Sequence, residues 1–89
     1  MQEKVRDFVV NALREMNYDV SEVTGETDLG PAGLDLESLA LADLAVQVED
    51  AFGVKFGLDE MESTAMMTLD EFTAEIAGRI AAAQAAETA

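Results

Sequence analysis

Apolar residues recur at intervals of three and four in three stretches of the chain, which is the spacing of one face of an amphipathic helix. The first stretch covers residues 2–16, and its apolar positions are Val5, Phe8, Val9, Ala12, Leu13 and Met16. The second has Ser38 in its first turn, and its apolar positions are Leu41, Leu44, Ala45, Val48 and Phe52. The third follows Thr68, and its apolar positions are Leu69, Phe72, Ile76 and Ile80. The sequence therefore predicts three amphipathic helices that share one core.

Residues that favour helix ends lie at the borders of these stretches. Asn17 and Gly53 tolerate left-handed backbone geometry, so we expect them to end the first and second helices. Thr68 and Glu71 have the spacing of a capping box, which predicts that the last helix begins here. We expect Arg79 near the C-terminal end of that helix, where a cation complements the helix dipole.

The connections between the helices are of unequal length. Residues 17–35 form a turn-rich first loop, and a loop this long is uncommon unless it has anchors or a function. We expect its apolar residues to pack beneath the helices, with a mobile linker as the alternative; these residues are Val20, Val23, Leu29 and Leu34. After Gly53, an extended segment is expected to insert Val54 and Phe56 into the core. Residues 59–64 are expected to form a short third helix.

These elements make a small all-α four-helix bundle, with three longer helices, one short helix and a long first loop. A chain of 89 residues has room for one small core, which we assign to residues 1–84. Residues 85–89 lack large apolar side chains, so we expect a tail that frays from about Ala85. No apolar run approaches the roughly 18 residues needed to cross a bilayer, and no signal peptide is recognised. We therefore expect a cytoplasmic protein. The length favours a discrete protein, with a domain excised from a synthase as the alternative.

The chain carries 19 acidic and five basic residues and a formal net charge of −14. Nucleic acids and anionic lipid surfaces are bound mainly through Lys and Arg, so the sequence argues against both kinds of partner. Basic proteins are the expected partners, and the chain itself is expected to be a monomer. With no Cys and no His, the chain lacks a thiol nucleophile and a near-neutral general base, so we expect that it is not an enzyme.

Ser38 lies where the second predicted helix begins. Backbone N–H groups there lack intrahelical partners, and the helix dipole is positive, so a phosphate group would be well placed. From position alone, a serine that caps the helix is the simpler explanation. A hydrolase nucleophile is excluded because no His or other evident base stands ready to accept its proton.

Residues 33–39 read Gly-Leu-Asp-Leu-Glu-Ser-Leu and are followed by an acidic amphipathic helix. This run resembles the attachment motif of acyl carrier proteins, with Glu37 in place of the usual Asp before Ser38. The resemblance extends from about Val5 to Ile80, because helix order and loop placement also agree. It implies that the Ser38 hydroxyl is esterified by 4′-phosphopantetheine from coenzyme A, whose thiol holds acyl groups as thioesters.

The second helix also carries apolar and acidic residues together on its outward side. A solvated face explains the acids but not the apolar residues among them. An apolar centre bordered by acids suits transient docking, in which burial attracts and charge orients. The resemblance implies that basic patches on a phosphopantetheinyl transferase, a ketosynthase, an acyltransferase and other synthase enzymes dock here. The predicted docking residues are Glu37, Leu39, Asp43, Val46, Glu49 and Asp50.

The predicted function is therefore an acyl carrier protein of fatty acid or polyketide synthesis. One alternative is an aminoacyl or peptidyl carrier, although such carriers more often have Gly-Gly-x-Ser at this site and are less acidic. Another is an acidic helical adaptor with no prosthetic group. The flexible methionines could shelter an acyl chain, but filling of core gaps explains them more simply; they are Met16, Met61, Met66 and Met67.

No EF-hand pattern is present among the many carboxylates, so we expect diffuse attraction of cations and no defined metal site. Added salt or Mg²⁺ should therefore raise the melting temperature, because screening weakens the self-repulsion of the folded chain. A gain of about 1 kcal/mol corresponds to about 4–8 °C in a domain of this size. Thermal unfolding followed by circular dichroism measures this, and a melting temperature indifferent to both additions would contradict the screening argument.

Overall fold

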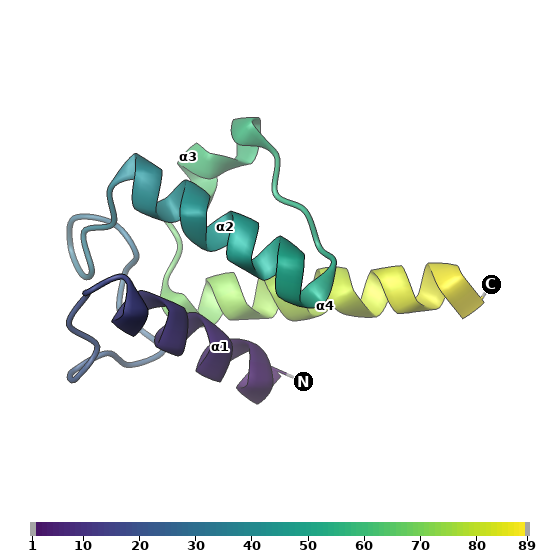
Figure 1. Cartoon of the computed structure of the whole chain (residues 1–89), viewed down its shortest axis with the longest axis horizontal. Coiled ribbons are helices and arrows are strands. Elements are labelled where there is room, and N and C mark those ends of the chain that lie inside the picture. Colours follow the sequence, from purple (N-terminus) through teal and green to yellow (C-terminus); the bar gives the residue numbers. More distant parts are fainter. Residues whose placement is uncertain (1, 89) are drawn as a thin grey trace.

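Helices occupy most of the chain in the computed structural model, which describes residues 2–88 except for the side chains of residues 58 and 86–88. The elements are α1 (Gln2–Glu15), α2 (Ser38–Phe52), the 3-10 turn η1 (Leu58–Glu60), α3 (Met61–Thr64) and α4 (Leu69–Thr88). Figure 1 shows α1, α2 and α4 as the long elements, with α3 as a short segment above α2. No β-strand occurs among residues 2–88. The predicted all-α bundle of three longer helices and one short helix is confirmed.

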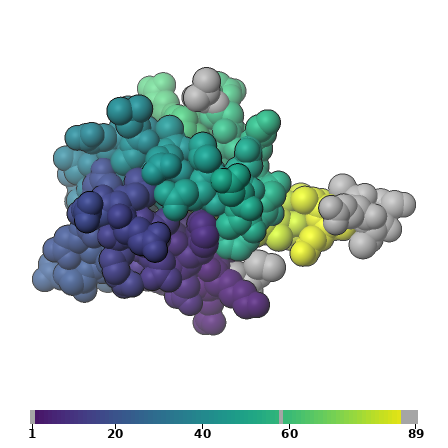
Figure 2. All heavy atoms as spheres, viewed as in Figure 1, coloured from purple at the N-terminus to yellow at the C-terminus, as the bar shows by residue number. Residues whose placement is uncertain are grey.

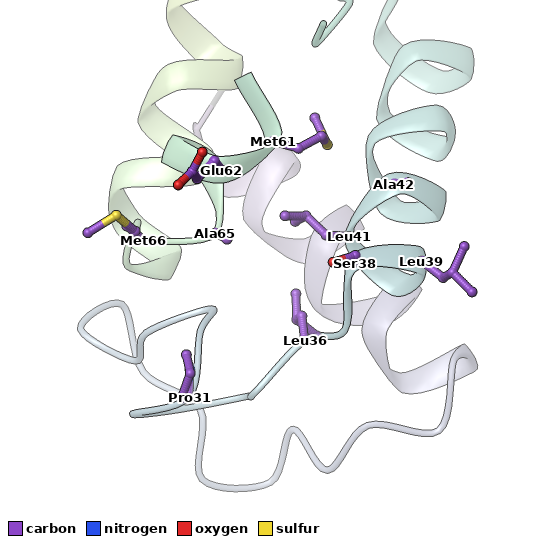
Figure 3. A pocket seen from close by; sticks show the side chains of 10 residues that line it. All are labelled: Pro31, Leu36, Ser38, Leu39, Leu41, Ala42, Met61, Glu62, Ala65 and Met66. Atoms are coloured by element: carbon purple, nitrogen blue, oxygen red, sulfur yellow. The ribbon is translucent and has the colours of Figure 1, made fainter. Parts of the chain in front are cut away.

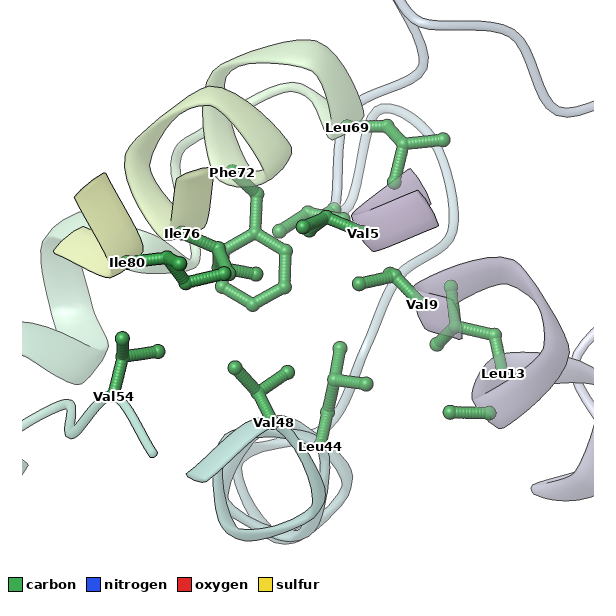
Figure 4. Packing of buried hydrophobic residues seen from close by; sticks show 12 residues of the cluster. Val5, Val9, Leu13, Leu44, Val48, Val54, Leu69, Phe72, Ile76 and Ile80 are labelled. Carbon is green, nitrogen blue, oxygen red and sulfur yellow. The ribbon is translucent and has the colours of Figure 1, made fainter. Parts of the chain in front are cut away.

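The core lies where the three long helices meet. α1 contacts both α2 and α4. The side chains drawn in Figure 4 converge from the three helices, and Val54 approaches from the connection after α2. The apolar stripes are therefore confirmed as core faces; the fully buried members include Val5, Val9, Leu13, Leu44, Val48, Phe72 and Ile76.

The helix ends follow the expected signals. Asn17 and Gly53 have positive φ angles of 71° and 73°, and the Gly53 N–H donates to the Glu49 carbonyl oxygen over 2.8 Å. At the start of α4, the Thr68 N–H donates to a Glu71 carboxylate oxygen over 2.9 Å. The Glu71 N–H donates in return to Thr68 Oγ1 over 3.2 Å. These reciprocal bonds are a capping box, which satisfies N–H groups that the helix itself leaves unpaired.

The long first loop is anchored. Leu29 is fully buried, and the other three predicted anchors pack against the core; they are Val20, Val23 and Leu34. The loop also pairs with the start of α4, because the Leu29 N–H donates to the Met67 carbonyl over 3.0 Å and the Leu69 N–H to that of Thr27 over 2.8 Å. Single-sequence patterns did not indicate this short antiparallel bridge. The arrangement favours the anchored loop over the mobile linker.

Two elements differ from the expected bounds. The third helix is split into the 3-10 turn η1 and the single-turn helix α3. The backbone of α4 continues to Thr88, past the point where fraying was expected, because alanine has the highest helix propensity. Residues 81–85 are exposed, and in Figure 2 this part of α4 projects from the body of the molecule. The domain boundary at residue 84 stays a prediction, and Ala89 lies outside the described residues.

Candidate functional site

Ser38 is the first residue of α2. The residue before it, Glu37, occupies the N-cap position with an extended backbone, and the Glu37 side chain makes no capping hydrogen bond. The side chain of Ser38 is exposed, and within residues 2–88 its hydroxyl has no hydrogen-bond partner. The explanation of Ser38 as the helix cap is therefore not supported. The structure leaves its hydroxyl available at the helix start.

The other two serines of the chain are engaged. The Ser21 hydroxyl donates to Asp19 Oδ1 over 2.6 Å. This hydrogen bond, together with one from the Ser21 N–H, holds the pKa of the Asp19 carboxyl below its ordinary value. The Ser63 hydroxyl donates to the Glu60 carbonyl oxygen over 3.1 Å. Among the three serines, Ser38 alone has a hydroxyl with no partner in the described residues 2–88.

The loop before Ser38 is fixed by its own backbone. The N–H groups of residues 34–36 donate to the carbonyl oxygens of residues 28–30 over 2.8–2.9 Å. The last of these bonds runs from Leu36 to Leu29, whose side chain is buried in the core. Asp35 has a positive φ of 54°, a conformation that Asp tolerates better than most residues with a Cβ. The attachment of this segment to the core determines where the chain enters α2.

A cleft of about 720 Å³ lies beside Ser38, between the start of α2, the first loop and α3. Figure 3 shows the side chains of Leu36 and Leu41 on one side and Met61 on the other, whereas Leu39 points away from the gap. Met66 also lines the cleft and is 81% exposed. Two of the four predicted flexible methionines therefore lie next to Ser38, in a mostly apolar hollow.

The predicted docking residues fall into two groups. Five of the six are exposed: Glu37, Leu39, Asp43, Val46 and Asp50. Leu39 is 83% exposed and Val46 is 55% exposed, so both apolar side chains lie open to solvent. Glu49 is half-buried and lines a small hollow with Phe56 and Met61, so it faces α3. Met66 was not predicted as a docking residue, although it adds apolar surface near Ser38.

Residues 5–76 match the model of a protein family described as the phosphopantetheine attachment site. The chain belongs to this family. No curated protein and no solved structure shows significant similarity to it. As a phosphopantetheine carrier domain, the chain takes a covalently attached 4′-phosphopantetheine arm and interacts with a phosphopantetheinyl transferase and with synthase enzymes. Carrier domains of this family are generally not catalytic.

The residues around the α2 start fit this group. An exposed hydroxyl is open to modification, and the free N–H groups and positive dipole of the first helical turn favour an attached phosphate. Among the described residues, no cluster of three or more acidic side chains is arranged to hold a metal ion. Within the same residues, no helix is both long and apolar enough to span a membrane.

The positive φ of Asp35 gives a prediction about the entry to α2. An Asp35→Ala variant should be less stable than Asp35→Gly by about 1 kcal/mol, because a Cβ in the left-handed region costs about 1–2 kcal/mol and glycine does not bear this cost. Both variants remove the same charge, so they control for each other. Urea unfolding measures the difference, and equal midpoints would show that this conformation is not maintained in solution.

Proposed function

We propose that the chain is an acyl carrier protein whose 4′-phosphopantetheine arm is attached to the Ser38 hydroxyl. The observation that supports this most is the pairing of the family match with a single exposed serine whose hydroxyl has no partner in the part of the chain that the structure describes. Ser38 also follows Glu37 and precedes Leu39, close to the Asp-Ser-Leu sequence of the acyl carrier motif. The proposed role of the chain is to carry reacting groups and leave their chemistry to partner enzymes.

When attached, the arm supplies a flexible tether with a terminal thiol that holds acyl groups as thioesters. The contribution of this chain is to provide a fixed origin for it. Ser38 is set on a helix that packs into the core through Leu44 and Val48, and the preceding loop is held by backbone hydrogen bonds. A rigid origin restricts the region that a tethered group can reach, so docking of the carrier decides which enzyme receives it.

We propose that the exposed side of α2 is the docking surface for these enzymes. Leu39 and Val46 provide apolar area, and Asp43 and Asp50 provide charge beside them. Such a surface favours quick, reversible association with basic patches, which a carrier that visits several enzymes needs. The acidic α2 and the acid before Ser38 favour acyl cargo from fatty acid or polyketide synthesis over aminoacyl cargo.

Intact mass spectrometry tests the attachment site. Incubation with coenzyme A, Mg²⁺ and a broad-specificity phosphopantetheinyl transferase should add the mass of one arm to the protein. The Ser38→Ala variant should gain no mass, because the acceptor oxygen is gone. If the parent protein gains no mass, the alternative function of an acidic helical adaptor without a prosthetic group is favoured.

Two matched variants control this experiment. Ser21→Ala and Ser63→Ala each remove a serine hydroxyl that is engaged elsewhere, and both should gain one arm as the parent does. A gain that persists in Ser38→Ala would place the arm on another residue. Loading of the modified protein with acyl and with aminoacyl donors then separates an acyl carrier from a peptidyl carrier.

Paired charge variants test the docking surface. Asp43→Asn with Asp50→Asn on α2 should slow modification at low salt by about fivefold, because steering by these acids is lost. Glu3→Gln with Asp7→Asn on α1 changes the net charge equally and should leave the rate close to that of the parent. The difference should shrink as salt is added. Equal slowing in both pairs would mean that only the net charge matters.

A further inference from the structure

Arg79 of α4 has an unusually complete set of partners in a segment far from it in sequence. Its guanidinium donates to the two carboxylate oxygens of Glu60, from Nη2 over 2.5 Å and from Nη1 over 3.3 Å. Nη1 also donates to the Lys55 carbonyl oxygen over 2.7 Å. The guanidinium lies 4.1 Å from the centre of the Phe56 ring. Within α4, Nε donates to Glu75 over 2.9 Å.

This set of contacts differs from an ordinary surface ion pair. Arg6 and Asp70 approach only to 3.7 Å, and their side chains are 41% and 55% exposed. Pairs of that kind contribute little to stability. The Arg79 side chain is 27% exposed, and its fork engages a carboxylate, a backbone carbonyl and an aromatic face together. A planar guanidinium that satisfies several fixed partners holds their relative positions.

Glu60 passes this restraint to α3. Its carboxylate accepts a hydrogen bond from the Gly57 N–H over 2.7 Å, and its carbonyl accepts one from Thr64 Oγ1 over 2.8 Å. Glu60 is therefore tied to α4 through its side chain and to α3 through its backbone. The next residue is Met61, which lines the cleft opposite Leu41 (Figure 3).

α3 needs such a restraint. It has four residues, Met61–Thr64, and a helix of one turn is not stable by itself in water. α3 packs mainly against η1 and α2. The ring of Phe56, which Arg79 covers, packs against Phe72 of the core at 5.6 Å between ring centres. The contacts of Arg79 therefore connect the segment before α3 to the buried core.

We propose that Arg79 is a positioning residue that, through Glu60, fixes α3 and so sets the width of the cleft beside Ser38. The placement of α3 by Arg79 is a property of the protein without the arm. Its consequence for cargo rests on the proposed function. If Ser38 carries the arm, the contacts between Arg79 and Glu60 limit the bulk of apolar cargo that can lie between Met61 and Leu41. Arg79 touches neither Ser38 nor the cleft, so it acts only through the segment that it holds.

The charge state of the pair is constant over ordinary pH. The hydrogen bond from Arg79, with that from Gly57, lowers the pKa of the Glu60 carboxyl from 4.5 to about 2. The same pairing raises the pKa of Arg79. Because the folded-state pKa of Glu60 is depressed, the stabilisation is fully present above the ordinary pKa and is lost as the pH falls from there toward 2. The ion pair between Arg79 and Glu60 is therefore present throughout the neutral pH range.

Hydrogen exchange and methyl NMR of the unmodified protein test this role. Arg79→Met keeps an apolar stem over Phe56 but removes the guanidinium. Amide exchange in residues 57–66 should speed up by about tenfold, because α3 then opens locally while the core stays closed. The ε-methyl signals of Met61 and Met66 should shift, whereas that of Met16, which contacts Gln47, should not.

Arg6→Met is the matched control, since it removes the same charge and an exposed ion pair. It should leave exchange in residues 57–66 within about twofold of the parent, as expected for a weak surface pair. Equal effects of the two variants, or faster exchange in residues 57–66 only in parallel with that of the buried helices, would overturn the proposal. If Arg79→Met does not fold, Glu60→Gln decides, and it should loosen the same residues. Failure of the arm to attach at Ser38 would refute the proposed function and leave this result unaffected.

Discussion

The pairing of the first loop with the start of α4 is the constraint on which the position of Ser38 depends. Leu29 is buried in the core, and its N–H is bonded to the Met67 carbonyl. Its own carbonyl accepts the N–H of Leu36, two residues before the serine. These bonds fix a turn-rich segment with little secondary structure, and so they fix the point at which the chain enters α2. Without these bonds, buried backbone groups of the loop would lose their partners, and the entry to the helix would not be defined.

The rest of the site follows from that fixed entry. α2 buries one face in the bundle and leaves the opposite face, with Leu39 and Asp43, to solvent. Ser38 stands between this exposed face and the cleft that α3 closes. An exposed face with apolar and acidic residues and a mostly apolar cleft therefore lie on either side of a single hydroxyl. Both surfaces are supported by the same small core.

Local signals in the sequence predicted most helix borders, because the responsible interactions are close in sequence. Asn17, Gly53 and the Thr68–Glu71 capping box act within one turn of the helix they end or begin. Where the relevant contacts are distant, the predictions were incomplete. Arg79 was expected to serve the dipole at the end of α4, yet α4 continues to Thr88 and Arg79 binds Glu60, 19 residues away along the chain.

Residue types and their spacing within a few positions are enough to specify the helical class, the core-facing residues, the negative charge and the serine that matches the carrier motif. Only the packing of the folded chain shows that the Ser38 hydroxyl has no hydrogen-bond partner among residues 2–88 and that a cleft adjoins it. The same packing places Glu49 at a hollow shared with Met61 of α3, and it brings Arg79 against the Lys55 carbonyl oxygen. These features depend on the packing of elements distant in sequence, and periodicity within one helix carries no information about which neighbour covers each face.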